Sequence, residues 1–321
     1  MQTLILTRAD VEALGSMTLA VDAVEGAFTA FGRGEGTMPP KIYLSVAEGS
    51  GDFRAMPAAL GDRAGIKWVN VHPANQARGD LPTVMGTFIL NSPETGFPLA
   101  VMDATALTAL RTGAAGAVAS KHLVRQPPAT VGFIGAGVQA RTLHDAHRVV
   151  FPNFDAVIHD RDEEAAKRLA ATIGGRTGSL AEAARADVVC TATPSRKPFL
   201  GADMVKPDAH INAMGADAPG KQELETNLLR EAAVYVDDIH QAASSGEVNV
   251  PFKQGALTED DLAGSLGEIV AGVLAPNHDG VTVFDSTGLA VQDLALAAAI
   301  YDAARERGVG LEVDFLGSTA G

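Results

Sequence analysis

Apolar residues recur along this chain with the periods of helices and of strands, and the order of these elements changes near residue 130. In the leading part, Val21, Val24, Phe28 and Phe31 stand at helical spacing, so residues 17–36 predict an amphipathic helix that stops in glycines. Strand-like stretches rich in alternating apolar residues follow at 41–47, 52–58, 64–71, 83–90 and 97–103. The turn NSPETG predicts that the last of these strands runs antiparallel to the one before it.

A helix rich in small residues is predicted for 105–123, and the following VRQPPA segment marks a boundary because its paired prolines end the helix. From residue 130 the pattern changes to strand–helix alternation, which is typical of a parallel sheet. The expected strands are 130–134, 155–159, 187–192, 209–213, 233–236 and 281–284. Capping boxes that begin at Ser179 and at Ser265 predict two of the intervening helices.

The C-terminal stretch 288–316 predicts a long amphipathic helix and then a strand that no helix follows. Such a strand need not join the parallel sheet, and we expect it to return to the first domain. The fold class is therefore α/β, with a Rossmann-type doubly wound parallel sheet at 126–294 inserted into a second, α+β domain. That second domain is discontinuous and comprises 1–125 and 295–321.

Composition narrows the functional classes. A hydrophobic content of 46% in 321 residues is typical of a globular protein, and the net charge of −14 argues against nucleic acid or an anionic membrane as a partner. No apolar run is long enough to span a membrane, and the first residues do not resemble a secretory signal. The single cysteine, Cys190, lies in an apolar run and is expected to be a small buried hydrophobe. These features predict a cytoplasmic protein.

The stretch TVGFIGAGVQARTL at 130–143 carries the clearest chemical motif. Gly135, Gly137 and Ala140 follow a predicted strand in the spacing of the dinucleotide fingerprint, where the glycines permit a tight turn and close approach of a pyrophosphate. Asp160 ends the next strand, 25 residues after Gly135, where a carboxylate accepts hydrogen bonds from the adenine ribose. This favours NAD, while the adjacent Arg161 leaves NADP open because it can hold a 2′-phosphate.

Other polar residues allow two interpretations each. Lys67 is either a solvated residue of a face-alternating strand or a partly desolvated amine whose pKa is lowered enough for proton transfer. Arg54 is either a surface residue or a bidentate clamp for a carboxylate. Arg111, among small residues, needs an anionic partner, for which cofactor phosphates are candidates. Asp217 is either a turn residue or a ligand-binding group at a strand end.

The chain carries two histidines three residues apart, and it lacks two common hydrolase motifs. His144 and His147 at i, i+3 could ligate a metal, but without a third ligand of suitable spacing they are better explained by packing, so no metal site is predicted. No G-x-S-x-G elbow and no Cys/His nucleophile pattern is present, so hydrolytic chemistry has little support.

Seven segments together resemble the ornithine cyclodeaminase / mu-crystallin family, to which archaeal-type alanine dehydrogenases belong. They are RAMPA, GIKWVNVHP, the long stretch from LPTV to SKHL, GFIGAGVQA, GADAPGKQEL, SGEVNVP and VFDSTGLAVQD, in order and across nearly the whole chain. The resemblance implies a homodimer whose discontinuous domain binds substrate and dimerises, and whose inserted domain holds NAD(H).

The resemblance also implies roles for individual residues. Arg54 and Lys67 match substrate-contacting positions, Lys67 acts in proton transfer, and Asp217 matches the acid/base aspartate of the cyclodeaminases. Implied cofactor contacts, added to Gly135, Gly137, Asp160 and Arg161, are Thr83, Arg111, Val138, Gln139, Met214, Gly215, Ala216, Lys221 and Ser286.

These groups suit hydride transfer at the α-carbon of a small L-amino acid, which gives a 2-imino acid. Residues 65–122 look most like the archaeal-type enzymes, so NAD-dependent alanine dehydrogenase is the favoured activity. Ornithine cyclodeaminase and ketimine or pyrroline-2-carboxylate reductase stay open as alternatives. A non-enzymatic small-ligand carrier is the alternative from a different class, and the presence of Arg54, Lys67 and Asp217 argues against it.

Overall fold

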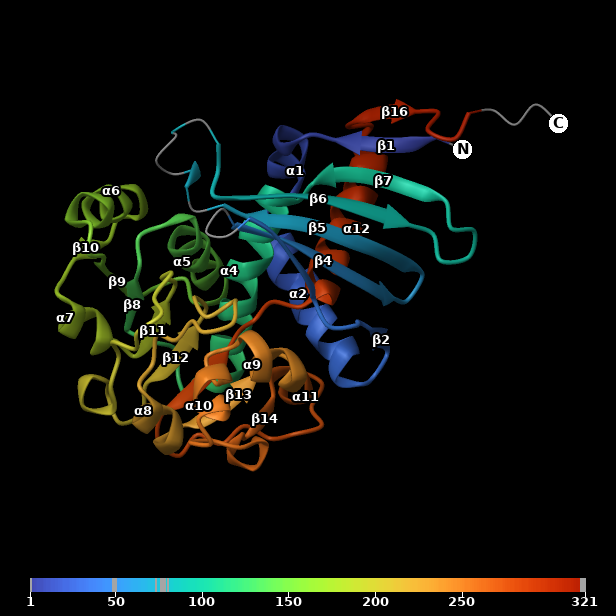
Figure 1. The fold of residues 1–321 in the computed structure, drawn as a ribbon. Helices are drawn as coiled ribbons and strands as arrows, with labels where there is room; N and C mark the ends of the chain where they lie inside the picture. The colour runs from blue at the N-terminus through green and yellow to red at the C-terminus, as the bar shows by residue number, and fades with distance from the viewer. Residues whose placement is uncertain (1, 48–50, 73, 76–78, 80, 318–321) are drawn as a thin grey trace. The chain divides into compact units, whose positions relative to one another are not determined.

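The chain folds into two compact units, each with its own sheet (Figure 1). The computed structural model describes residues 2–47, 51–72, 74–75, 79 and 81–317. The first unit comprises the described residues of 1–111 and 289–321, and the second comprises 112–288. Helix α4 (Ala104–Leu123) is continuous across the first limit.

The first unit is built on a mixed sheet whose strands run in the order β16-β1-β7-β6-β5-β4-β2, with β3 also paired to β4. Its strands are β1 (Thr3–Leu6), β2 (Gly36–Thr37), β3 (Ile42–Ala47), β4 (Gly51–Leu60), β5 (Arg63–Val71), β6 (Val84–Asn91), β7 (Pro98–Asp103) and β16 (Leu311–Val313). Its helices are α1 (Arg8–Leu14), α2 (Met17–Gly32) and α12 (Ala290–Arg307).

The two ends of the chain meet in this sheet. Strand β16 pairs antiparallel with β1, so the prediction that the last strand returns to the first domain is confirmed. Strand β7 runs antiparallel to β6, which confirms the predicted hairpin. Helix α12 packs against α2 and against β4 and β5, and in Figure 1 it appears as the long red helix. One face of the sheet is therefore covered by α12.

The second unit is an all-parallel sheet with the strand order β10-β9-β8-β11-β12-β15-β13-β14. Its strands are β8 (Thr130–Ile134), β9 (Asp155–His159), β10 (Arg176–Thr177), β11 (Val188–Thr191), β12 (His210–Ala213), β13 (Ala233–Val236), β14 (Gly264–Ser265) and β15 (Thr282–Asp285). Its helices, including two 3₁₀ turns, are α5 (Val138–Val150), α6 (Glu163–Ile173), α7 (Leu180–Ala184), η1 (Ala202–Met204), α8 (Thr226–Glu231), α9 (Ile239–Ser245), α10 (Asn249–Lys253), η2 (Glu259–Asp261) and α11 (Leu266–Val270).

The strand order reverses between β8 and β11, which is the topological switch point where doubly wound sheets bind ligands. The predicted fold class is confirmed, and the expected strands of this sheet lie within one residue of those observed. Both predicted capping boxes form, at Ser179 with Glu182 and at Ser265 with Glu268.

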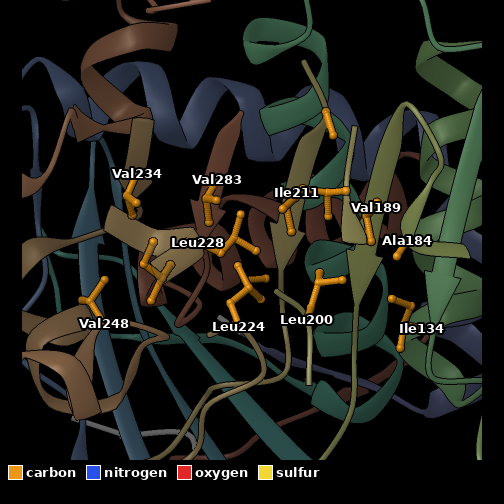
Figure 2. Close-up of a cluster of buried hydrophobic side chains, with 14 of the residues drawn as sticks. Ile134, Ala184, Val189, Leu200, Ile211, Leu224, Leu228, Val234, Val248 and Val283 are labelled. Carbon is orange, nitrogen blue, oxygen red and sulfur yellow. The ribbon is translucent and has the colours of Figure 1, made fainter. Parts of the chain in front are cut away.

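A continuous apolar layer supports this sheet. Figure 2 shows Val189, Ile211, Val283 and Val234 on neighbouring strands, each buried. Strands covered on both faces are expected to be almost wholly apolar, and β11, β12 and β15 are buried along their full lengths. The rigid sheet therefore fixes the loops at the carboxyl ends of its strands.

The limits of the compact units, after 111 and after 288, differ from the predicted domain limits after 125 and after 294. Two helices account for the difference. The second half of α4 belongs with the second unit, where a Cβ on Gly113 would come within 2.3 Å of Thr142 O. All of α12, from Ala290, packs in the first unit. The substrate-binding and dimerisation role of the discontinuous domain stays a prediction.

Candidate functional site

The glycine turn of the second unit has the geometry of a pyrophosphate cradle. Gly135 has a φ of +104°, and a Cβ there would lie 2.6 Å from Ala192 O at the end of β11. At Gly137 a Cβ would meet no atom within 4 Å, so the space above the turn is open. Helix α5 begins at Val138 with no side-chain cap, which leaves its first N–H groups available to an anion. These residues fit a dinucleotide.

Asp160 lies beside this turn. Its Oδ2 accepts a hydrogen bond of 2.7 Å from Ala136 N, and its Oδ1 accepts one of 2.9 Å from Asp162 N. The carboxylate therefore orders the turn itself and stays half-buried at the end of β9, where an adenine ribose is expected. Arg161 is exposed beside it, and Gln139 accepts a bond from Thr142 within α5.

The remaining predicted residues of the second unit lie at the ends of β12 and β15. Met214, Gly215 and Ala216 are buried directly after β12, and the N–H of Ser286 donates to Ala213 O at 3.1 Å. Lys221 Nζ lies 2.6 Å from Asp217 Oδ1 and donates to Gly215 O at 3.3 Å. Asp217 is thus a half-exposed, ion-paired residue of this loop, and its acid/base role stays a prediction.

In the first unit, Arg54 and Lys67 lie on the same buried face of the sheet. Strands β4 and β5 pair Arg54 with Val69 and Met56 with Lys67, which makes Arg54 and Lys67 diagonal neighbours, with Cβ atoms roughly 7 Å apart. Arg54 is 6% exposed and Lys67 is fully buried. The solvated interpretation of Lys67 is therefore wrong: the residue on the open face of β5 is Trp68, which stacks on Phe53.

Lys67 belongs to a buried ionic triad. Its Nζ lies 2.6 Å from Oδ2 of Asp293 on α12, while Arg111 Nε donates to Asp293 Oδ1 at 3.0 Å. The Nζ–Oδ2 contact is an ion pair that uses one of the three donors of the ammonium, so further donor capacity is left over. Arg111 therefore finds its anionic partner inside the first unit, and its contact with cofactor phosphates stays a prediction.

The environment of Lys67 favours the neutral amine. Burial, followed by the positive charges of Arg111 and Lys41, lowers its pKa to about 7 against the opposing effect of Asp293. A lysine poised near neutral pH can both accept and donate a proton. Arg54 is oriented by Asp52, which accepts bonds from Nε at 2.8 Å and from Nη2 at 3.3 Å.

Sequence reasoning missed Asp293 and Lys41. Asp293 stands in the quoted segment VFDSTGLAVQD, but its partner Arg111 is 182 residues away, so spacing could not reveal the pair. Lys41 precedes β3 and affects Lys67 through charge alone among the contacts described. Thr83 lies just before β6, where its carbonyl accepts from His72 N at 2.8 Å, and its cofactor contact stays a prediction.

Known proteins similar to this chain share its sequence pattern and its fold. The family model described as the ornithine cyclodeaminase/mu-crystallin family matches residues 1–308. The chain belongs to this family. Among its members, an alanine dehydrogenase of Archaeoglobus fulgidus is 48% identical over 98% of this chain and 99% of its own length.

Solved structures of family members are similar over their full lengths. An archaeal alanine dehydrogenase dimer with bound NAD superposes with a TM-score of 0.95 at 48% identity, covering 98% of this chain and 100% of its own. The Δ1-pyrroline-2-carboxylate reductase of Thermococcus litoralis, in complex with NADH and L-proline, gives 0.92 at 35% identity, covering 97% and 100%. The predicted family resemblance is thus confirmed.

The two histidines of α5 and the single cysteine are buried in the second unit. His147 is buried, contacts Ser120 Oγ at 2.9 Å and Leu143 O at 2.7 Å, and burial lowers its pKa to about 4. His144 packs against Phe133 and Phe154. Cys190 is buried, as predicted, and burial raises its pKa to about 12. Within the described residues, no helix is long and apolar enough to cross a membrane.

Proposed function

We propose that this protein is an NAD-dependent alanine dehydrogenase that converts L-alanine, NAD⁺ and water to pyruvate, ammonium, NADH and a proton. The observation that carries the proposal is the buried Lys67–Asp293–Arg111 triad beside Arg54, in a chain 48% identical to an archaeal alanine dehydrogenase. Its single cysteine and its composition favour the cytoplasm as its location.

In this proposal, Arg54 and each residue of the triad have separate tasks. The guanidinium of Arg54, held in plane by Asp52, binds the substrate carboxylate. Neutral Lys67 takes a proton from the substrate ammonium and passes it to solvent, then takes a proton from the water that attacks the imine carbon and returns it to the leaving nitrogen. Asp293 holds Nζ in place and is itself oriented by Arg111. When bound, NAD would supply the acceptor for the hydride that leaves the α-carbon.

The second unit would hold the cofactor. The pyrophosphate would lie over Gly137 and the first N–H groups of α5, and Asp160 would bind the adenine ribose. The other proposed cofactor contacts of this unit lie on the same edge of the sheet, at or after the carboxyl ends of its strands. They are Val138, Gln139, Met214, Gly215, Ala216, Lys221 and Ser286.

A substrate panel tests the activity. Purified protein receives alanine, ornithine, pyruvate with ammonium, or a cyclic ketimine, each with NAD(H) and NADP(H) in parallel. We expect alanine and NAD⁺ to accumulate NADH, read at about 340 nm by absorbance. Ornithine consumed to proline and ammonia without net NADH would instead indicate a cyclodeaminase. Turnover of cyclic ketimines alone would indicate a ketimine reductase, and turnover of none would contradict the enzymatic proposal.

Replacing Asp160 with alanine should weaken NADH binding about tenfold or more, because charge-assisted hydrogen bonds to the ribose are worth about 1.5–3 kcal/mol. The variant should also discriminate less against NADPH, since the carboxylate no longer repels a 2′-phosphate. Fluorescence titration measures both affinities. Asp155→Ala, at the other end of β9, is the control and should bind NADH as the wild type does. Unchanged affinity in Asp160→Ala would contradict the ribose contact.

The open face of the first sheet suits a second copy of the chain. Ile42, Leu44, Trp68 and Ile89 are exposed there, and the strand register places them on one face. A contiguous apolar patch of this kind is typical of a protein interface. The related archaeal alanine dehydrogenase was solved as a dimer.

Leu44→Glu should therefore shift the protein from dimer to monomer at micromolar concentration, because a buried unpaired carboxylate disfavours association. Light scattering after size-exclusion chromatography measures the mass. Val273→Glu changes a similarly exposed apolar residue of the second unit and should leave the dimer intact. A dimer that survives in Leu44→Glu would place the interface elsewhere.

A further inference from the structure

A fully buried carboxylate, Glu223, joins two loops at the carboxyl end of the parallel sheet. Its Oε1 accepts hydrogen bonds from the N–H and the hydroxyl of Thr193, at 2.8 and 2.6 Å. Its Oε2 accepts bonds from the Thr191 hydroxyl at 2.6 Å and from Gly215 N–H at 2.9 Å. Four donors from the ends of β11 and β12 therefore converge on one side chain.

Gly215 is packed tightly against this carboxylate. A Cβ at Gly215 would lie 2.4 Å from Thr193 O and 2.5 Å from the Glu223 carboxyl carbon, so only glycine allows the approach. In doubly wound sheets the glycine turn after β8 serves the adenosine half of the dinucleotide, while the strands beyond the switch point serve the other half. Glu223 therefore sets the loops on the nicotinamide side.

A second buried acid, Glu247, accepts hydrogen bonds from the backbone at Glu223. Its Oε1 accepts the N–H groups of Glu223 and Leu224, at 2.6 and 2.5 Å. Its own N–H donates to Asp285 Oδ1 at 2.8 Å, which ties the pair to the end of β15. Among the described residues, Oε2 of Glu247 has no hydrogen-bond partner.

Burial and mutual repulsion disfavour charge on both acids at once. Burial raises the pKa of Glu223, but its four donors oppose the rise. Burial together with the charges of Glu223 and Asp285 raises the pKa of Glu247 well above its usual range. The four donors therefore favour the charge on Glu223, and the raised pKa of Glu247 favours the proton on that member of the pair.

We infer that Glu223 is a positioning residue that holds the loops at 191–195 and 214–217 in the geometry that receives the nicotinamide half of the cofactor. Being fully buried, it does not touch the cofactor and acts through Thr193 and Gly215. This inference rests on the proposed binding of NAD, and it deepens that proposal by adding a residue that sequence reasoning left out.

Two glutamine variants distinguish the roles of Glu223 and Glu247. In Glu223→Gln the amide NH₂ must face a backbone donor in either orientation, Thr193 N–H on one side or Gly215 N–H on the other. In Glu247→Gln the amide oxygen keeps both N–H bonds, and the NH₂ takes the place of a protonated oxygen that no donor faces. The first substitution is disruptive and the second is conservative.

The test compares the affinities of NADH and ADP by fluorescence and calorimetric titration. We expect Glu223→Gln to raise the Kd of NADH about ten- to hundredfold, the effect of one lost charge-assisted hydrogen bond, and to change that of ADP by less than about twofold. Glu247→Gln should leave both within about twofold of wild type. Amide hydrogen exchange without cofactor should be faster at Thr193 or Gly215 in Glu223→Gln only.

Equal weakening of NADH and ADP would show a merely structural role and overturn the inference, as would an unchanged NADH affinity or an equal loss in Glu247→Gln. If Glu223→Gln fails to fold, Thr191→Val removes one donor at a fully buried position, and the same NADH-selective loss is expected, smaller in size. Wild-type protein that binds no NADH would refute the proposed function, whereas the exchange measurement would still report on Glu223.

Discussion

Replacing Lys67 with methionine should lower kcat for alanine oxidation by about 10²- to 10⁴-fold, the range for loss of a general acid–base group. Methionine fills the buried site with little change in volume and leaves Asp293 paired with Arg111. NADH affinity should stay near that of the wild type, because the glycine turn belongs to the second unit. Steady-state kinetics and NADH titration measure the two effects.

Lys167→Met is the matched control, since Lys167 is exposed on α6 and pairs with Glu164 at the surface. It should retain wild-type turnover. A Lys67→Met enzyme within about tenfold of wild-type kcat would contradict the role of Lys67 in proton transfer.

The pH dependence follows from the same residue. With its pKa lowered to about 7, Lys67 is a neutral base above that pH, so kcat/KM for alanine oxidation should rise through pH 7 and then level off. Reductive amination, which needs the ammonium, should fall over the same range. The lowered pKa also means that the unfolded chain binds more protons between pH 7 and 10.5, so this group's contribution to stability increases with pH there. Lys67→Met should lack both effects.

Replacing Asp293 with asparagine should lower the free energy of unfolding by about 3–5 kcal/mol, because breaking a buried ion pair leaves its partner charges uncompensated. Here two cations, Lys67 and Arg111, lose the carboxylate that lies between them. Urea denaturation followed by circular dichroism measures the loss. It should be larger at pH 6 than at pH 9, because Lys67 can lose its proton at the higher pH.

The variant should also move the pH step of catalysis below 7, since Asp293 raises the pKa of Lys67 and its removal leaves burial and Arg111 unopposed. Asp302→Asn lies on the same helix, where Asp302 pairs with Arg63 at an exposed site, and should cost less than about 1 kcal/mol. Equal, mild effects of the two substitutions at both pH values would show that Asp293 does not act as the counterion.

Local sequence patterns were sufficient to predict the helices and strands and to recognise the nucleotide-binding motif. Helical spacing identified α2, strand–helix alternation identified the parallel sheet, and the unaccompanied last strand predicted the pairing of β16 with β1. Period and capping depend on residues a few positions apart, so they can be read from sequence. The glycine spacing and Asp160 belong to the same class, because the turn and the next strand end are close along the chain.

The buried chemistry was decided by tertiary structure. Strand β5 carries apolar residues on both faces, so alternation alone could not tell whether Lys67 or Trp68 faces the interior; α12, from the far end of the chain, covers the face of Lys67. Burial then sets the lowered pKa of Lys67 and pairs it with Asp293. The sequence by itself determined the elements and the cofactor turn, whereas desolvation and long-range ion pairing, which arise only when distant segments pack, decided which polar groups became reactive.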